Sequence, residues 1–238
     1  MVSLLLVGPA GAQDRDLESV GHVLGSPEAP LVVVEFGDFA CGACALFHEG
    51  TWPTIRREFV ETGQVFWRHV PFVLGFPRGK EATRAAECAA DQGRYWQMHE
   101  VLFTRQDEWK EARKPEESLV RYAEAIGLDR HRFQRCYEED GGKERTERAN
   151  DAAADLGVRA TPTFFIDGFR VQGALSVEAF RALLTRPPSA PTPRRAHRGI
   201  PGAEGGRETL PCTAPHPSVA PRPGAGAPAA EQPPFWQR

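Results

Sequence analysis

Short apolar runs alternate with longer helical patterns in the first third of the chain. Residues 31–36 are apolar except for Glu35, which is typical of a buried strand covered on both faces. Residues 41–61 have a helical pattern, and Pro53 is expected to kink or split that helix because proline lacks a backbone donor. Residues 64–71 predict a second strand. The pattern therefore indicates a β-α-β unit.

Helical periodicity replaces strand periodicity over the middle of the chain. Helices are expected over residues 80–91, 95–104, 116–126, 129–138 and 143–156. Residues 75–156 are therefore predicted to be an all-helical insertion between two strands. Residues 14–30 are instead polar and interrupted by glycine and proline, so they are expected to form an extended lead-in.

The next strand signal is a hairpin. Two short apolar runs flank Asp167 and Gly168, a residue pair that favours a tight hairpin turn. Pro162 stands at the head of the first run, where a proline is tolerated and where a cis peptide bond would be a specific feature of the fold. Ser176 is expected to cap a last helix over residues 177–185.

The first residues have the composition of an export signal. An apolar run over residues 2–7 is followed by Ala10-Gly11-Ala12, which fits a small-residue cleavage site. No Lys or Arg precedes this run and it is short, so a start further upstream and a disordered terminus both stay open. We predict that residues 1–12 are a signal peptide, complete or truncated, and that the protein is extracytoplasmic, in the periplasm or otherwise outside the cytoplasmic membrane.

The end of the chain differs in composition from the rest. Residues 187–238 hold 13 of the 21 prolines and few aliphatic residues, so they are predicted to be a disordered Pro/Ala/Gly/Arg-rich tail. A flexible tail and a segment translated out of frame both stay open. Cys212 lies in this tail and is expected to be dispensable. Residues 13–186 are expected to be the folded domain.

The overall composition permits a core and argues against two classes of function. Of the 238 residues, 41% are hydrophobic, which is enough for a sizeable core. The net charge of −3 argues against a general nucleic-acid binder, which is normally basic over a whole face. No run approaches about 18 continuous apolar residues, so no membrane span is predicted.

Two cysteines stand where the first predicted strand gives way to its helix. The first turn of a helix leaves backbone N–H groups unpaired and carries the positive end of the helix dipole, and both favour a thiolate. Cys41 is therefore the expected nucleophile. Cys44, one turn further, is placed to close a disulfide with Cys41 and to release any mixed disulfide that Cys41 forms.

Glu35 is the one carboxylate in the first apolar run. Burial of a lone carboxylate is costly, so the pKa of Glu35 is expected to rise. A carboxyl with a raised pKa beside a thiol pair can shuttle protons near neutral pH. The alternative is that the side chain of Glu35 points to solvent.

Metal binding at the cysteine pair is the alternative use of these thiols. His48 follows Cys44 by four residues, so Cys41, Cys44 and His48 could share one helix face. A closed zinc site needs four ligands, and no further Cys or His pair is spaced to complete it. We therefore expect no metal site and no cofactor, with His48 at the surface or in packing and with His69 and His99 as packing residues.

Cys88 and Cys136 both fall in predicted helices of the insertion. In an exported protein they could form a structural disulfide, which would stabilise the fold by about 4 kcal/mol in the chain-entropy model. The alternative is a pair of buried, inert thiols that behave as small apolar residues.

Three motifs follow one another along the chain: Glu35-Phe-Gly-Asp-Phe-Ala-Cys-Gly-Ala-Cys44, Cys88-Ala-Ala-Asp-Gln-Gly-Arg-Tyr-Trp-Gln-Met-His99 and Gly157-Val-Arg-Ala-Thr-Pro-Thr-Phe-Phe-Ile166. In this order they resemble the motifs of the DsbA-like thiol-disulfide oxidoreductases, which have a thioredoxin fold with a helical insertion. The resemblance covers about residues 20–185. It implies an α/β fold with a central mixed sheet flanked by helices and an inserted all-helical subdomain.

The resemblance also implies a role for each matching residue. Cys41 would be the exposed attacking thiolate and Cys44 the buried resolving thiol. Thr161 and Pro162 would lie against the cysteine pair and bind the substrate backbone. Glu35 would take and return the proton of the deeper thiol.

The predicted function is that of an exported protein-disulfide oxidoreductase. Its expected partners are client proteins that bear thiols or disulfides and a redox partner that resets the cysteine pair, with the chain acting as a monomer and no nucleic acid involved. Gly42-Ala43 lacks the His that strong oxidants of the family carry between the cysteines, so a potential between about −270 and −120 mV is expected. Two alternatives stay open: an extracytoplasmic thioredoxin-like reductant, and a non-catalytic metal-binding or client-binding module.

Overall fold

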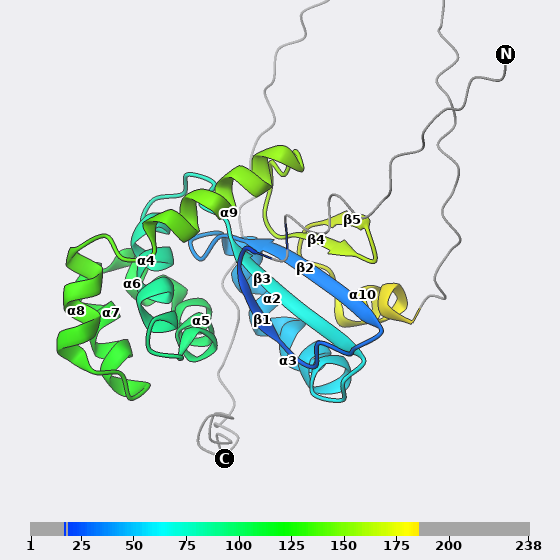
Figure 1. The fold of residues 1–238 in the computed structure, drawn as a ribbon, viewed down its shortest axis with the longest axis horizontal. Coiled ribbons are helices and arrows are strands. Elements are labelled where there is room, and N and C mark those ends of the chain that lie inside the picture. Colours follow the sequence, from blue (N-terminus) through cyan, green and yellow to red (C-terminus); the bar gives the residue numbers. More distant parts are fainter. Residues whose placement is uncertain (1–16, 18, 186–238) are drawn as a thin grey trace, which may run out of the picture. The chain divides into compact units, whose positions relative to one another are not determined.

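The computed structural model describes residue 17 and residues 19–185 (Figure 1). The predicted signal peptide and the predicted tail, with Cys212, lie outside the described residues. The elements are β1 (His22–Leu24), β2 (Leu31–Gly37), α2 (Gly42–Gly50), α3 (Trp52–Ile55), the π-helix η1 (Arg56–Val60), β3 (Val65–Pro71), α4 (Gly79–Ala90), α5 (Tyr95–Thr104), α6 (Gln106–Glu111), α7 (Pro115–Ala125), α8 (Arg130–Glu138), α9 (Lys143–Asp155), β4 (Thr163–Ile166), β5 (Phe169–Gln172) and α10 (Val177–Leu184).

The strands form one mixed sheet in the order β1-β3-β2-β4-β5. β2 pairs in parallel with β3 and antiparallel with β4, so the first apolar run is the central strand, as its composition predicts. The predicted α/β fold with a central mixed sheet is confirmed. The parallel register places Glu35 of β2 directly beside His69 of β3.

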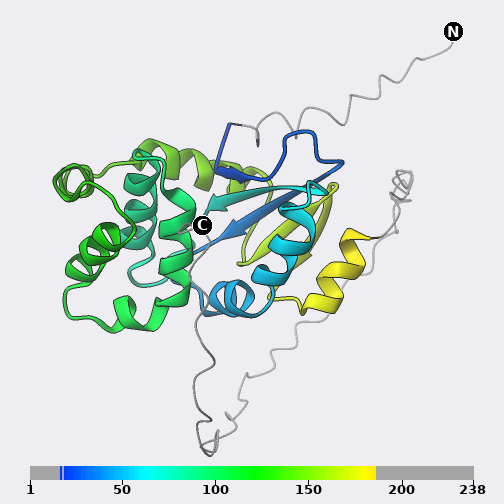
Figure 2. The ribbon, with the colours of Figure 1, turned by 90° about the horizontal axis from the view of Figure 1, so that it is seen from below.

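Helices cover both faces of this sheet (Figures 1 and 2). Val33 of β2 packs with Phe47 of α2 and Phe180 of α10 in one apolar cluster. Phe36, three residues further along β2, packs on the opposite face with Ala149 of α9. Side chains alternate between the two faces of a strand. Glu35 therefore shares the face of Val33, toward α2.

The helix that carries the cysteines is split, as Pro53 predicts. α2 ends at Gly50, and Thr51 is both its C-terminal cap and the N-terminal cap of α3. Pro53 occupies the first turn of α3, where its missing N–H needs no partner. The break keeps the α2 helix nine residues long, with both cysteines at its N-terminal end.

Part of the predicted lead-in is a strand. β1 pairs antiparallel with β3, and its Val23 carbonyl accepts a hydrogen bond of 2.7 Å from the indole N–H of Trp96. Three residues are too few to show an alternating pattern, so sequence reasoning missed this edge strand.

The helical insertion packs around an apolar core that it shares with the cysteine loop and the start of α2. Trp109 of α6 and Phe133 of α8 are fully buried there. Cys88 of α4 and Cys136 of α8 are joined in a disulfide with an S–S distance of 2.01 Å. Gly141 leaves room for this bond, since a Cβ there would lie 2.9 Å from the Cys88 sulfur. The α6 helix has one apolar residue facing the core, so its sequence gave no periodicity from which to predict it.

Within the described residues, no helix combines the length and the apolar character needed to cross a bilayer.

Candidate active site

Cys41 lies between the end of the central strand and the first turn of α2. It is the N-cap residue of α2, with an extended backbone, and its carbonyl accepts the first helical hydrogen bond from the Ala45 N–H at 3.1 Å. Its side chain therefore meets the unpaired N–H groups of the helix start. Cys44 lies one turn further and is fully buried.

Asp38 stabilises the loop between the end of β2 and Cys41. Its side chain is fully buried and accepts hydrogen bonds from the N–H of Ala40 at 2.9 Å and from the N–H of Leu74 at 2.8 Å. Burial raises the pKa of this carboxyl, although both hydrogen bonds oppose the shift. Sequence reasoning missed Asp38, although a carboxylate three residues before the cysteine pair was a readable signal.

Helix α6 holds the same loop from the other side. The amide nitrogen of Gln106 donates to the carbonyl of Phe39 at 2.7 Å and to the carbonyl of Cys41 at 3.0 Å. The Nζ of Lys110 donates to the carbonyl of Ala40 at 2.9 Å. Three successive carbonyls are thus satisfied by one short helix of the insertion, which explains how the insertion supports the cysteine loop.

Thr161 contacts Cys41, and the peptide bond between Thr161 and Pro162 is cis. The Cys41 sulfur is 3.3 Å from the Thr161 carbonyl oxygen, to which its thiol donates. This contact leaves Cys41 only 4% exposed, so the expectation of an exposed thiol is wrong for this structure. The resemblance alone did not reveal how closely the proline loop covers the sulfur.

The two thiols have opposite acidities. A hydrogen bond from the Cys44 thiol, helped by the side chain of Thr161 and by the N–H groups of Ala43 and Cys44, lowers the pKa of Cys41 to about 5 against the opposing effect of burial. Burial, together with the hydrogen bond to Cys41 and its charge, raises the pKa of Cys44 well above its ordinary value. At neutral pH the pair therefore holds a thiolate at Cys41 and a protonated thiol at Cys44.

We expect the ultraviolet thiolate absorbance of the reduced protein to rise with a midpoint near pH 5. Because the folded pKa lies below the ordinary value of 9.0, the thiolate stabilises the reduced fold fully above pH 9 and loses this effect as the pH falls through about 5. Absorbance titration of the wild type and of Cys41→Ser measures this, and a wild-type midpoint near 9 would contradict the assignment.

Glu35 is fully buried, so the expectation that it does not face solvent is confirmed. Its Oε1 lies 2.8 Å from Nε2 of His48. Burial would raise the pKa of Glu35, but the ion pair and hydrogen bond with His48 outweigh it and hold that pKa below its ordinary value. The expected rise in pKa is therefore wrong, because the sequence did not reveal a buried partner. A proton-transfer role of Glu35 toward Cys44 stays a prediction.

His48 is buried rather than on the surface, and it is paired with Glu35 rather than turned to the thiols. Among the described residues, the ligand atoms of Cys41, Cys44 and His48 do not come together as a metal-binding group. His48 instead lies beside His99, with ring centroids 4.5 Å apart. Packing was expected for His69 and His99, but their meeting with His48 was not.

Comparison with known proteins places this fold and site in a family. The family model described as Thioredoxin matches residues 18–186. A Na(+)/H(+) antiporter NhaA 3 from Salinispora tropica is 39% identical over 171 residues, which are 71% of this chain and 24% of the antiporter. The chain thus spans about a quarter of the length of the curated relatives it matches.

Two solved structures share the fold. BdbD from Bacillus subtilis, in its oxidised form, is 22% identical with a TM-score of 0.63, covering 68% of this chain and 89% of that one. The α-DsbA1 of Wolbachia pipientis is 23% identical with a TM-score of 0.61, covering 71% and 93%. The chain therefore belongs to the thioredoxin family and has the fold of the DsbA-like thiol-disulfide oxidoreductases.

Proposed function

We propose that this protein is an extracytoplasmic thiol-disulfide oxidoreductase that forms or exchanges disulfides in client proteins. The observation that supports this proposal most directly is the pair of unequal thiols beside the Thr161-Pro162 loop. Cys41 is a thiolate at neutral pH, because its pKa is about 5, and Cys44 is a buried thiol within its reach. Disulfide exchange needs one attacking thiolate and one resolving thiol, and this pair supplies both.

In the oxidising direction, a client thiolate attacks the Cys41 sulfur of the Cys41–Cys44 disulfide. A mixed disulfide forms, and the Cys44 sulfur leaves and takes up a proton. A second client thiolate then attacks the client sulfur of the mixed disulfide, and Cys41 leaves as a thiolate. The client loses two electrons and the pair gains two, so a further redox partner must reset the pair. Thr161 and Pro162 bind the client backbone in this proposal.

The acidity of Cys41 favours the oxidising direction. Thioredoxin, a reductant, has a thiolate pKa of about 7, and the strong oxidant DsbA has one of about 3.5. A more stable thiolate stabilises the reduced pair and makes its disulfide more oxidising. The value of about 5 for Cys41 lies between these two. We propose a moderate oxidant, weaker than the family members that carry His between the cysteines.

The disulfide between Cys88 and Cys136 supports the location outside the cytoplasm, because such bonds persist in oxidising compartments. The predicted signal peptide in residues 1–12 is the second support for this location. We propose that the chain acts as a monomer.

The oxidised full chain should oxidise a reduced, unfolded client with two cysteines, and Cys41→Ser should reduce the rate to background. Equilibration of the pair with glutathione should give a potential between about −270 and −120 mV. The fraction of oxidised pair is read by thiol alkylation and mass spectrometry.

A potential of about −270 mV would contradict the proposed oxidising role and favour the reductant. If no client is turned over at any glutathione ratio, the proposed catalytic activity is contradicted. The non-catalytic module that grips unfolded chains would then be favoured.

A further inference from the structure

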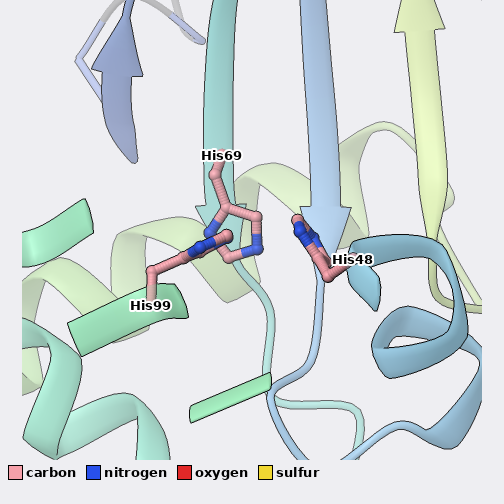
Figure 3. Close-up of side chains that lie close together, drawn as sticks. All are labelled: His48, His69 and His99. Carbon is pink, nitrogen blue, oxygen red and sulfur yellow. The ribbon is translucent and has the colours of Figure 1, made fainter. Parts of the chain in front are cut away.

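Three buried histidines meet between the sheet and the helical insertion. His48 comes from α2, His69 from β3 and His99 from α5. Figure 3 shows the three rings pointing toward one another. One ligand nitrogen from each ring lies within 4.8 Å of the other two. Residues from three separate elements thus place their ring nitrogens around one point.

Each ring has a nitrogen without a hydrogen-bond partner among the described residues. These atoms are Nδ1 of His48, Nε2 of His69 and Nε2 of His99, and all three are buried. Buried polar atoms are nearly always satisfied by the protein, by water or by an ion. Three orphaned nitrogens in one cluster therefore indicate a missing central partner.

Two of the rings are already held by their other nitrogen. Nε2 of His48 lies 2.8 Å from the Glu35 carboxylate, and Nδ1 of His69 lies 2.6 Å from the Tyr95 hydroxyl oxygen. Histidines that bind a metal usually use the second nitrogen in this way, which fixes the ring and aims the free lone pair at the ion. A carboxylate partner also offsets part of the positive charge of an ion.

Two of the three rings are held neutral. Burial lowers the pKa of His69 to about 3 and that of His99 well below its ordinary value. Neutral imidazole is the form that binds metal ions.

Gly37, at the end of the central strand, lets the side chains of His69 and Glu35 approach the backbone closely. A Cβ at Gly37 would lie 2.6 Å from Nε2 of His69 and 3.3 Å from Oε1 of Glu35. Tetrahedral coordination at about 2.0–2.1 Å needs nitrogens about 3.3 Å apart. The three ligand nitrogens lie within 4.8 Å of one another, so no pair has to close by more than about 1.5 Å.

We propose that His48, His69 and His99 form a binding site for one divalent transition-metal ion of the zinc type. Neutral imidazoles suit zinc, copper and nickel, and a site with three histidine ligands and no sulfur favours zinc when coordination is tetrahedral. Glu35 and Tyr95 are positioning residues that hold two of the rings. The ion would join the insertion to the sheet behind the cysteine helix, and its positioning residue Glu35 is also the carboxylate that we predict to exchange a proton with Cys44.

The test uses cobalt(II) as the probe and the oxidised full chain, with its remaining thiol alkylated so that no cysteine can bind the metal. One cobalt ion per chain should bind, with the visible absorption of a tetrahedral site and without a thiolate charge-transfer band. Glu35→Gln should weaken binding about 10–100-fold, as loss of such an outer partner does elsewhere. His99→Gln should weaken it further, and His131→Gln, on the surface, should leave it unchanged.

Near-ultraviolet circular dichroism checks that each variant is folded. If His99→Gln does not fold, Gly37→Ala decides, because it keeps all three ligands and crowds Nε2 of His69. Gly37→Ala should then weaken binding at least about 10-fold. No stoichiometric binding to the oxidised chain, or equal binding by the wild type and the folded ligand variant, would overturn the metal site and favour a buried water at its centre.

Discussion

Cys44→Ser is expected to leave client proteins covalently attached to Cys41. The Cys41 thiolate of this variant can still attack a client disulfide, because its own sulfur and the adjoining helix start are unchanged. The mixed disulfide that forms between Cys41 and the client then has no neighbouring thiol to resolve it. Turnover should fall by about 10³-fold or more, because the two cysteines act as one catalytic unit and removing either residue of such a unit abolishes most of its activity. Non-reducing electrophoresis of the variant incubated with oxidised client measures the adducts.

The matched control is Cys41→Ser/Cys44→Ser, which should form no adduct at these positions. Mass spectrometry of the adduct should place the client on Cys41. Client attached to Cys212 instead, or equal adduct on the double variant, would contradict the assignment of Cys41 as the nucleophile. Slow release of the adduct on addition of dithiothreitol would show that the bond is a disulfide.

The parts of the fold that follow from local pattern were predictable from the sequence. The unbroken apolar run of β2 indicates a central strand, and Pro53 breaks the cysteine helix because it lacks a donor. Asp167-Gly168 marks the hairpin between β4 and β5. In each case the deciding interaction lies within a few residues of the signal, so neighbouring sequence was enough.

The missed parts of the site depend on contacts between distant segments. Gln106 reaches the carbonyl of Cys41 across 65 residues, and His48 reaches Glu35 across 13. The pKa of Glu35 illustrates the consequence: burial was predicted correctly, but its effect is reversed by a histidine on another element. A burial pattern in the sequence predicts that a charged group will be desolvated. It does not identify the residue whose charge or hydrogen bond offsets the cost of that desolvation.

The histidine cluster depends on the register of β2 and β3, which only the structure reveals. The parallel pairing makes Glu35 and His69 neighbours on the face toward the cysteine helix. His48 of that helix then lies within hydrogen-bond distance of the Glu35 carboxylate. His99 does not follow from this register, because it comes from the insertion, whose placement on the sheet no pattern in the sequence specifies.

Cys88→Ala/Cys136→Ala is expected to lower the free energy of unfolding by about 4 kcal/mol. The disulfide closes a loop between residues 48 positions apart, and removing it restores the conformational freedom of that loop in the unfolded chain. Urea unfolding of the wild type and the variant, both with Cys41 and Cys44 oxidised, measures the difference. The rate of client oxidation at low temperature should stay close to that of the wild type, because neither residue contacts the reacting sulfurs.

Cys136→Ala alone separates the cross-link from packing. It removes the bond but leaves the fully buried Cys88 side chain in the core of the insertion. If the cross-link carries the stabilisation, the single variant loses nearly as much stability as the double variant, and the extra loss from Cys88→Ala is about 1 kcal/mol, the value for one small buried group. A loss below about 1 kcal/mol in the double variant would instead mean that the insertion is held by its apolar core, with Trp109 and Phe133 at its centre, and that the disulfide adds little to it.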